Sequence, residues 1–264
     1  MQPLDRFPMD VRRRIEIVLC DIDDTLTTDG RLLAASYESL ERLQQAGLRV
    51  LPVTGRPAGW CDHIARMWPV DGVVGENGAF FFSYDHAAQR MTRLYRLSAE
   101  QRSADRQRLD ALEARILREV PGSAVASDQA YREADLAIDY CEDVEALPEE
   151  AVARIVAIFE EAGATAKVSS IHVNGWFGDY DKLSMTRRIL EEHFGFEPEW
   201  SLEHAVFVGD SPNDAPMFGF FPHAVGVANV RRFEGRLAAA PAYVTQASDS
   251  AGFTELAEAL LSAR

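Results

Sequence analysis

Short apolar runs alternate with amphipathic segments along the first part of the chain. Three apolar runs predict buried strands: residues 15–20, 48–53 and 72–75. Two segments between them predict helices, one over residues 36–46 and one from Pro57 to about Met67. Ser36 is suited to cap the first of these helices, and Gly47 stands where its C-cap belongs. Strands that alternate with helices at these spacings predict a parallel sheet with right-handed crossovers.

The pattern changes after residue 78. Two strand-like runs, at 79–84 and 91–97, lie close enough together to form a hairpin. Further predicted elements are a long helix near 99–119, a strand in the second half of 130–141, a helix after Pro148, and strands at 164–170 and 171–177. Antiparallel strands accompanied by two helices favour an inserted α+β domain, a cap, over residues 82–178.

The parallel pattern resumes beyond the cap. Asp181 can cap a helix, strands are predicted at 204–210, 224–227 and 242–244, and Phe253, Leu256 and Leu260 mark a closing helix. The expected fold class is therefore α/β. Residues 1–81 and 179–264 are expected to form a doubly wound, Rossmann-like parallel-sheet core that the cap interrupts.

Composition and charge exclude some classes of function. The chain has 264 residues, of which 47% are hydrophobic and 26% charged, as in ordinary globular proteins. A net charge of −15 argues against nucleic acid or an anionic membrane as a main partner, since both need a basic surface. Three scattered cysteines predict reduced thiols, and no run approaches the roughly 18 apolar residues of a membrane span. We expect a soluble, unprocessed, cytoplasmic protein.

Carboxylates follow the ends of the predicted core strands. Asp21 and Asp23 follow the first strand, and Asp210 follows the strand at 204–210. Ligands of open parallel sheets bind beyond the carboxyl ends of the strands, so these side chains are expected at one rim. In an extended segment Asp21 and Asp23 would point to one side, and their repulsion would call for a cation. With Asp210 they form an all-oxygen donor set suited to Mg²⁺.

Two further features fit an anionic ligand at this rim. Thr54 and Gly55 stand at a strand-to-helix turn, where a hydroxyl and free backbone N–H groups can bind an oxyanion. Lys182 is one of only two lysines, against 25 arginines, so a compact ammonium at this position is an exception in this chain. Each feature has a structural alternative, a common turn for the first and a solvated helix residue for the second.

Together these motifs resemble the haloacid dehalogenase (HAD) superfamily. The strings that carry the resemblance are Asp21-Ile22-Asp23-Asp24-Thr25, Thr54-Gly55-Arg56, Lys182 and Gly209-Asp210-Ser211-Pro212-Asn213-Asp214. A cap between the second and third motifs is typical of the C2-capped members. The string Glu76-Asn77-Gly78-Ala79 is similar to that of the IIB subfamily, which includes Cof-like enzymes and sucrose-phosphate, trehalose-phosphate and mannosyl-3-phosphoglycerate phosphatases. Leu183 departs from the pattern, since many relatives have Gly there.

The resemblance implies a Mg²⁺-dependent phosphatase acting on a small phosphate monoester, with a sugar phosphate as the expected class. Asp21 would be the nucleophile that forms an aspartyl-phosphate, and Asp23 the general acid and base. The ion would bind the carboxylates of Asp21 and Asp210 and the backbone carbonyl of Asp23. The phosphoryl oxygens would be held by Thr54, Gly55, Lys182 and Asn213. Asp214 would orient a metal-bound water or Lys182.

The cap would exclude water and recognise the leaving group. Its candidate recognition residues are Arg132, His172, Asn174 and Trp176, which lie near predicted strand ends. Each has a structural alternative: Trp176 can serve packing alone, and Arg132 can pair with neighbouring acids. The five other histidines do not cluster, and we interpret them as structural or surface residues.

Two other functions remain open. A phosphomutase would use the same aspartyl-phosphate but protect it from water. A phosphoacceptor module, such as a receiver domain, also places Asp, Thr and Lys at strand ends. Asp23 favours an enzyme, because a receiver needs no group to protonate an alkoxide.

Overall fold

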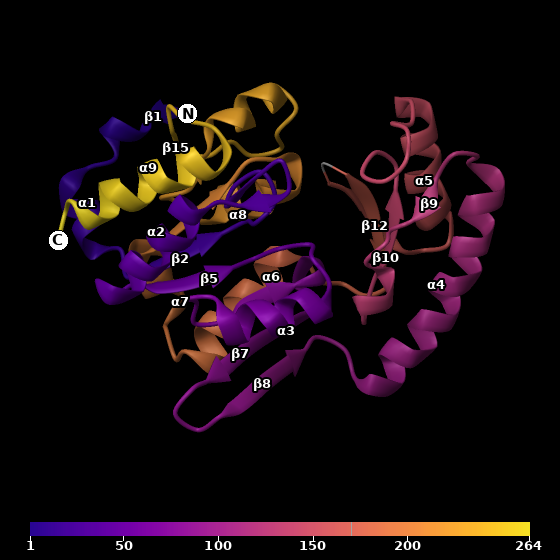
Figure 1. Cartoon of the computed structure of the whole chain (residues 1–264), viewed down its shortest axis with the longest axis horizontal. Helices are drawn as coiled ribbons and strands as arrows, with labels where there is room; N and C mark the ends of the chain where they lie inside the picture. The colour runs from indigo at the N-terminus through magenta and orange to yellow at the C-terminus, as the bar shows by residue number, and fades with distance from the viewer. Residues whose placement is uncertain (170) are drawn as a thin grey trace.

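A computed structural model describes residues 1–169 and 171–264. Its central sheet contains six parallel strands, in the spatial order β1 (Gln2–Pro3), β15 (Tyr243–Val244), β14 (Val225–Gly226), β13 (Ala205–Gly209), β2 (Ile17–Cys20) and β5 (Arg49–Pro52). β2 lies between β13 and β5 and pairs in register with both. Figure 1 shows this core at one end of the molecule, together with both termini, and the inserted unit at the other end. The predicted α/β fold is confirmed.

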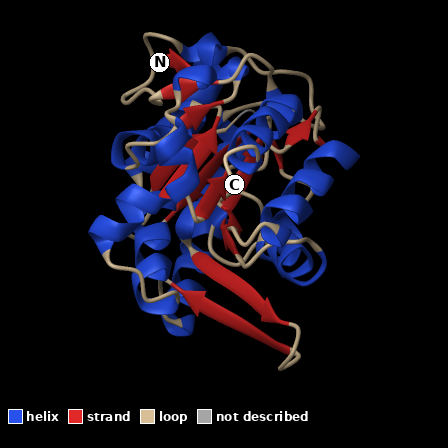
Figure 2. Ribbon diagram, turned by 90° about the vertical axis from the view of Figure 1, so that its left-hand side faces the viewer, coloured by secondary structure: helices blue, strands red, loops and turns tan. Residues whose placement is uncertain are grey.

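The sheet continues beyond β5 into an antiparallel extension. Val53 bridges to Val74 of β6 (Val73–Gly75), which pairs with the hairpin of β7 (Phe80–Asp85) and β8 (Arg90–Tyr95). Figure 2 shows this hairpin projecting from the core. The predicted cap boundary at residue 82 therefore falls within a strand of the core sheet. Because the phenylalanines of β7 are buried against both faces of the core, we propose that the inserted unit begins after β8.

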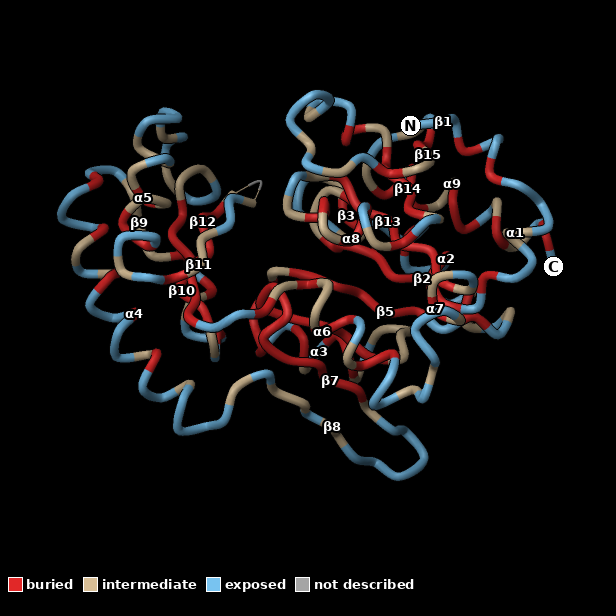
Figure 3. The backbone as a smooth tube through the Cα atoms, turned by 180° about the vertical axis from the view of Figure 1, so that it is seen from behind, coloured by how far each residue is buried: buried red, intermediate tan, exposed pale blue. Residues whose placement is uncertain are grey.

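Alternating side chains give the core two apolar layers. Val18 and Cys20 of β2 face one layer, whereas Ile17 and Leu19 face the other. The first layer is covered by α2 (Ala34–Gln45), α3 (Ala58–Met67) and α9 (Asp249–Leu261), and the second by α6 (Lys182–Arg188) and α8 (Ala215–Phe220). Two further helices, α1 (Met9–Arg14) and α7 (Pro198–His204), complete the core. Figure 3 shows the buried strands between these layers.

The inserted unit has its own sheet and its own apolar cluster. Its antiparallel strands follow the order β11 (Thr165–Val168), β12 (His172–Trp176), β10 (Leu136–Asp139) and β9 (Ala124–Val125). The helices α4 (Ala99–Glu119) and α5 (Glu149–Glu161) pack on one face of this sheet. α5 approaches β12 closely at Gly175, where a Cβ atom would lie 2.1 Å from the ring of Phe159. The opposite face of the sheet is thereby turned toward the core.

The predicted elements match the observed ones with a few differences at their ends. The expected N-cap at Ser36 is wrong, because α2 begins at Ala34 and Ser36 is buried within it. Gly47 has a φ of 85°, in the left-handed region that a helix C-terminus favours, and Asp181 caps α6 through a capping box with Ser184. The strand predicted at 164–170 ends at Val168, and Ser170 lies outside the described residues.

Within the described parts of the chain, every helix is too short or too polar to cross a bilayer. Cys20 and Cys61 are buried in the core.

Candidate active site

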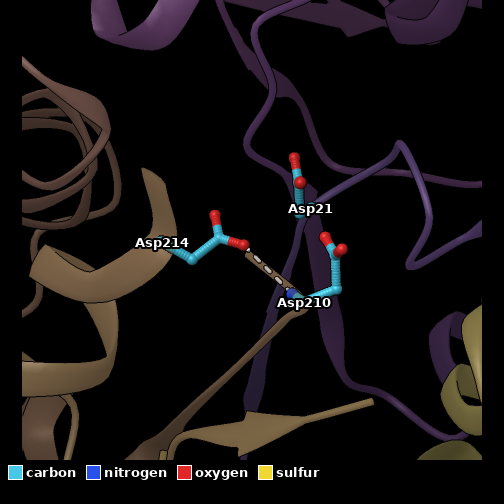
Figure 4. A group of neighbouring side chains, drawn as sticks. All are labelled: Asp21, Asp210 and Asp214. Carbon is cyan, nitrogen blue, oxygen red and sulfur yellow. Dashed lines mark hydrogen bonds between the residues drawn. The ribbon is translucent and has the colours of Figure 1, made fainter. Parts of the chain in front are cut away.

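The carboxyl ends of β2 and β13 deliver two buried aspartates side by side. Asp21 follows β2 and Asp210 follows β13, and each is 5% exposed. Asp214 joins them from the short helical turn Pro212–Asp214 that precedes α8, as Figure 4 shows. Each of the three carboxylates offers an oxygen within 4.8 Å of the other two. This spacing gives an all-oxygen cluster of the kind that a hard divalent cation binds.

Burial and repulsion between like charges raise the pKa values of two carboxylates in this cluster. Burial, together with the neighbouring carboxylates, raises the pKa of Asp21 to about 7, although Lys182 opposes the shift. Burial and the charges of Asp214 and Asp21 likewise raise the pKa of Asp210 well above its usual value. The buried carboxylates of Asp21 and Asp210 therefore depend on nearby cations for their ionised form. The donor set fits Mg²⁺, which prefers oxygen ligands.

Lys182 is the protein's own cation in this cluster. Its Nζ donates to Asp21 Oδ1 at 3.0 Å and to Asp214 Oδ1 at 2.8 Å, and the ammonium is buried. Burial disfavours the charged amine, but the two carboxylates outweigh it and raise the pKa of Lys182. Asp214 in turn accepts from the backbone N–H groups of Asp210 and Ser211, at 3.1 and 3.3 Å. Asp214 thus holds both Lys182 and the turn that carries Asp210.

Asp23 occupies a different electrostatic environment from Asp21. The chain turns after Asp21 instead of continuing as a strand, so the expectation of an extended Asp21–Asp23 segment is wrong. Arg56 donates to both oxygens of Asp23, at 2.7 to 3.0 Å. Each of the two carboxylates therefore has its own cation, Lys182 for Asp21 and Arg56 for Asp23. This separation suits two carboxylates that perform different tasks.

Some of the residues expected to bind a phosphoryl group lie in the same cleft as these aspartates. Gly55 and Asn213 line the cleft that contains Asp21 and Asp23. Thr54 is fully buried, and its hydroxyl accepts a hydrogen bond from the Arg56 N–H at 3.0 Å. Asn213 Oδ1 accepts from the Ser211 hydroxyl at 2.6 Å. The roles expected for these residues remain predictions.

The inserted unit supplies the opposite wall of the cleft. His172 and Asn174 project from β12 into it, because alternate residues of a strand share one face. Burial, reinforced by the charge of Arg132, lowers the pKa of His172 to about 4, so the ring is neutral at pH 7. Asn174 donates to Asp135 Oδ2 at 3.0 Å. These two cap residues are placed to meet a ligand bound over Asp21.

The other two candidate recognition residues, Arg132 and Trp176, differ in position, and Arg132 also lines the cleft. The Arg132 side chain is 1% exposed and pairs with both Asp128 and Asp135. It also donates to the backbone carbonyl of Gly55 at 3.0 Å, which ties the cap to the core motif. Trp176 is absent from the cleft wall formed by the described residues: it is buried and donates its indole N–H to the Tyr180 carbonyl at 3.2 Å. Trp176 thus packs inside the described part of the fold, and its expected role in recognition remains a prediction.

A buried carboxylate joins the cap to the core. Glu76 accepts from the Ala58 N–H at the start of α3, at 2.9 Å. It also accepts from three successive cap N–H groups, those of Glu133, Ala134 and Asp135, at 2.6 to 3.2 Å. Burial and the charge of Asp135 raise the pKa of Glu76 to about 8, while the backbone donors oppose this shift. Through these hydrogen bonds Glu76 joins the cap to the core and stabilises their closed arrangement.

Substituting Glu76 with Gln is expected to lower the free energy of unfolding by about 2 kcal/mol, because the new amide N–H₂ group would face backbone donors. Urea denaturation monitored by circular dichroism measures the change. The matched control is Glu41→Gln on the exposed face of α2, which we expect to change stability by less than about 0.5 kcal/mol. Equal stabilities for the two variants would contradict the role given to Glu76.

Two further residues of the site, Arg56 and Asn229, are not among the candidates that the sequence predicts. Arg56 belongs to the string Thr54-Gly55-Arg56, and its position shortly after a strand end is the signal that could have identified it. Asn229 donates to Asp210 Oδ2 at 3.2 Å and to the Asp24 carbonyl at 2.9 Å. It lies in a loop far along the chain from Asp210, and no pattern in the sequence marks it.

Known proteins resemble this chain in part by sequence and throughout by fold. The family model of haloacid dehalogenase-like hydrolases matches residues 18–105. No curated protein matches the sequence. A Thermoplasma acidophilum protein, 0175, has a TM-score of 0.71 at 18% identity, over 95% of this chain and 99% of that one.

Two other solved structures share this fold. A putative HAD/COF-like hydrolase from Plasmodium vivax has a TM-score of 0.68 at 16% identity, over 97% of this chain and 100% of that chain. The sucrose-phosphatase of Synechocystis sp. PCC6803, solved with sucrose and phosphate, has a TM-score of 0.63 at 18% identity. The match covers 95% of this chain and 98% of that chain. The family match over residues 18–105 and the shared fold confirm the resemblance found in the sequence.

Proposed function

We propose that this protein is a Mg²⁺-dependent phosphatase of a small phosphate monoester, with a sugar phosphate as the expected class. The observation that carries the proposal is the pair Asp21 and Asp23 in one cleft, each with its own cation. A nucleophile and a proton donor need separate electrostatic environments, and this pair has them. The choice of a sugar phosphate rests on structural neighbours such as the sucrose-phosphatase.

The reaction would proceed in two steps. An oxygen of Asp21 attacks phosphorus, the bond from phosphorus to the ester oxygen breaks, and Asp23 gives a proton to the departing alkoxide. Asp23 then takes a proton from the water that attacks the aspartyl-phosphate, which releases inorganic phosphate and restores Asp21. Lys182, Gly55 and Asn213 would hold the phosphoryl oxygens, and Thr54 would support the same turn.

Asp21, Asp210 and the backbone carbonyl of Asp23 would hold the Mg²⁺ ion, and Asp214 would orient Lys182. When bound, the ion neutralises charge between an anionic nucleophile and an anionic phosphate. The inserted unit would exclude water from the aspartyl-phosphate. His172 and Asn174 are its candidate contacts to the leaving group.

Phosphate release from a panel of sugar phosphates and one aryl phosphate, with Mg²⁺ or with EDTA, tests the proposal. We expect release with Mg²⁺ and a loss of at least about a hundredfold with EDTA, since the ion is needed to balance the buried carboxylates. Release that persists unchanged in EDTA would contradict the Mg²⁺ requirement. Turnover only with a bisphosphate activator would instead indicate a phosphomutase.

A further inference from the structure

A second cavity opens beside Asp23. Its volume is about 500 Å³, against about 30 Å³ for the cleft between Asp21 and the cap. Asp23 and Arg56 are the two residues that line both spaces. We call this second cavity the aromatic groove. Its size falls within the range of small-molecule sites, whereas the narrow cleft has room for little more than one or two water molecules.

Aromatic and aliphatic side chains form most of the groove. Its apolar wall consists of Ile22, Leu32, Trp60, Ile64, Trp68 and Tyr131. Trp60 and Tyr131 are 42% and 58% exposed, although large aromatic side chains are usually buried when they serve only packing. Arg56 lies over the Trp60 ring at 4.5 Å from its centroid, so the ring stands next to the residue that holds Asp23.

Core and cap both contribute to the groove. Trp60 comes from α3 of the core, while Tyr131 comes from the short helix Gln129–Tyr131 of the inserted unit. The two elements approach closely at Gly59, where a Cβ atom would lie 2.9 Å from Tyr131 Cβ. The hairpin of β3 (Thr27–Thr28) and β4 (Arg31–Leu32) forms a further side. The groove is therefore complete only when the cap is closed on the core.

We propose that the aromatic groove binds the leaving group of the substrate, and that this group carries a ring with a flat apolar face. The inference rests on the proposed phosphatase function, because it is the ester oxygen that must lie within hydrogen-bond reach of Asp23. The groove adjoins Asp23 and has room for a ring in the closed structure. Trp60 and Tyr131 supply the ring faces on which such a group stacks.

Two kinds of ring share this chemistry, an aromatic ring and a hexopyranose with its C–H face. The test compares kcat/KM for three esters: 1-naphthyl phosphate, a hexopyranose phosphate and ringless glycerol phosphate. In Trp60→Ala we expect the ratio of ring ester to glycerol phosphate to fall about tenfold, mainly through KM, since stacking acts on binding. The ring ester with the larger fall identifies the kind of ring that the groove accepts.

Matched variants separate the groove from general damage. Trp60→Phe keeps a ring face and is expected to keep the ratio within about twofold of wild type. Met67→Ala removes an exposed side chain from the end of the same helix and is expected to leave all three activities unchanged. Tyr131→Ala tests the cap side and should lower the ratio in the same direction as Trp60→Ala.

The outcomes distinguish this inference from the proposed function. No phosphate release from any ester by the wild type would defeat the proposed function, and the groove assignment with it. Release by the wild type with the same ratio in Trp60→Ala, for both ring esters, would overturn the groove assignment and leave the phosphatase intact.

Discussion

Replacing Asp21 with Asn is expected to reduce phosphate release by roughly ten-thousand-fold or more, since the amide cannot form an aspartyl-phosphate. The change keeps the size of the side chain and removes one charge from a buried group of carboxylates. Acid quenching of wild type during turnover should trap labelled phosphate on the protein, and Asp21→Asn should carry none. Retention of more than about a tenth of the activity by Asp21→Asn would contradict the role of Asp21 as nucleophile.

The stability of the same variant provides a check on folding. Lys182 still has Asp214 at 2.8 Å after Asp21 is neutralised, so the ammonium keeps a partner. Because burial and like charges raise the pKa of Asp21, we expect the metal-free variant to unfold at the same temperature as wild type or higher. Asp29→Asn is the matched control: Asp29 is exposed in the neighbouring hairpin, and this variant should keep full activity.

Replacing Lys182 with Met is expected to lower the free energy of unfolding by about 3 to 5 kcal/mol in EDTA, because it leaves buried carboxylates without their cation. Urea denaturation with EDTA and with Mg²⁺ measures the loss. Mg²⁺ should restore part of it, since an ion bound to Asp21 and Asp210 supplies positive charge in place of the ammonium. A loss below about 1 kcal/mol in EDTA would contradict this account.

A double variant isolates the electrostatic cause. Adding Asp214→Asn to Lys182→Met removes one of the uncompensated charges, so the double variant should be more stable than Lys182→Met alone. The loss in Lys182→Met should also grow with pH. Asp21 already has a pKa of about 7 when folded, above its ordinary value of 3.8, so the folded state holds a proton that the unfolded state releases. Without Lys182 that pKa rises further, and stability falls from pH 6 to pH 8.

Much of the fold follows from local patterns in the sequence. The helix predicted near 99–119 is observed at Ala99–Glu119, and the buried run at 204–210 appears as β13. Helical periodicity and continuous apolar runs are local properties, so they can be recognised in the amino-acid sequence alone. The error at Ser36 has a local cause as well. A serine can cap a helix or lie inside one. Because α2 packs against the core, Ser36 lies inside the helix and is buried.

The hairpin of β7 and β8 shows where local patterns fail. Its alternation predicts two paired strands, and this is correct, but pairing alone does not say which sheet they join. Phe81 opposite Val74 joins the hairpin to β6 and hence to the core sheet. That contact depends on the placement of β6, and it supports the proposed boundary of the cap after β8.

The sequence by itself determined the motifs and their order, because strand ends, turn residues and the exceptional Lys182 are visible without coordinates. Only the tertiary structure decided which of these side chains pair with one another. Arg56 donates to Asp23, and Lys182 donates to both Asp21 and Asp214. Glu76 accepts hydrogen bonds from backbone N–H groups of the cap. The aromatic groove, which Trp60 and Tyr131 form together, likewise exists only after folding. The physical reason is that charge pairing and burial depend on distances between segments far apart in the chain, and local periodicity carries no information about those distances.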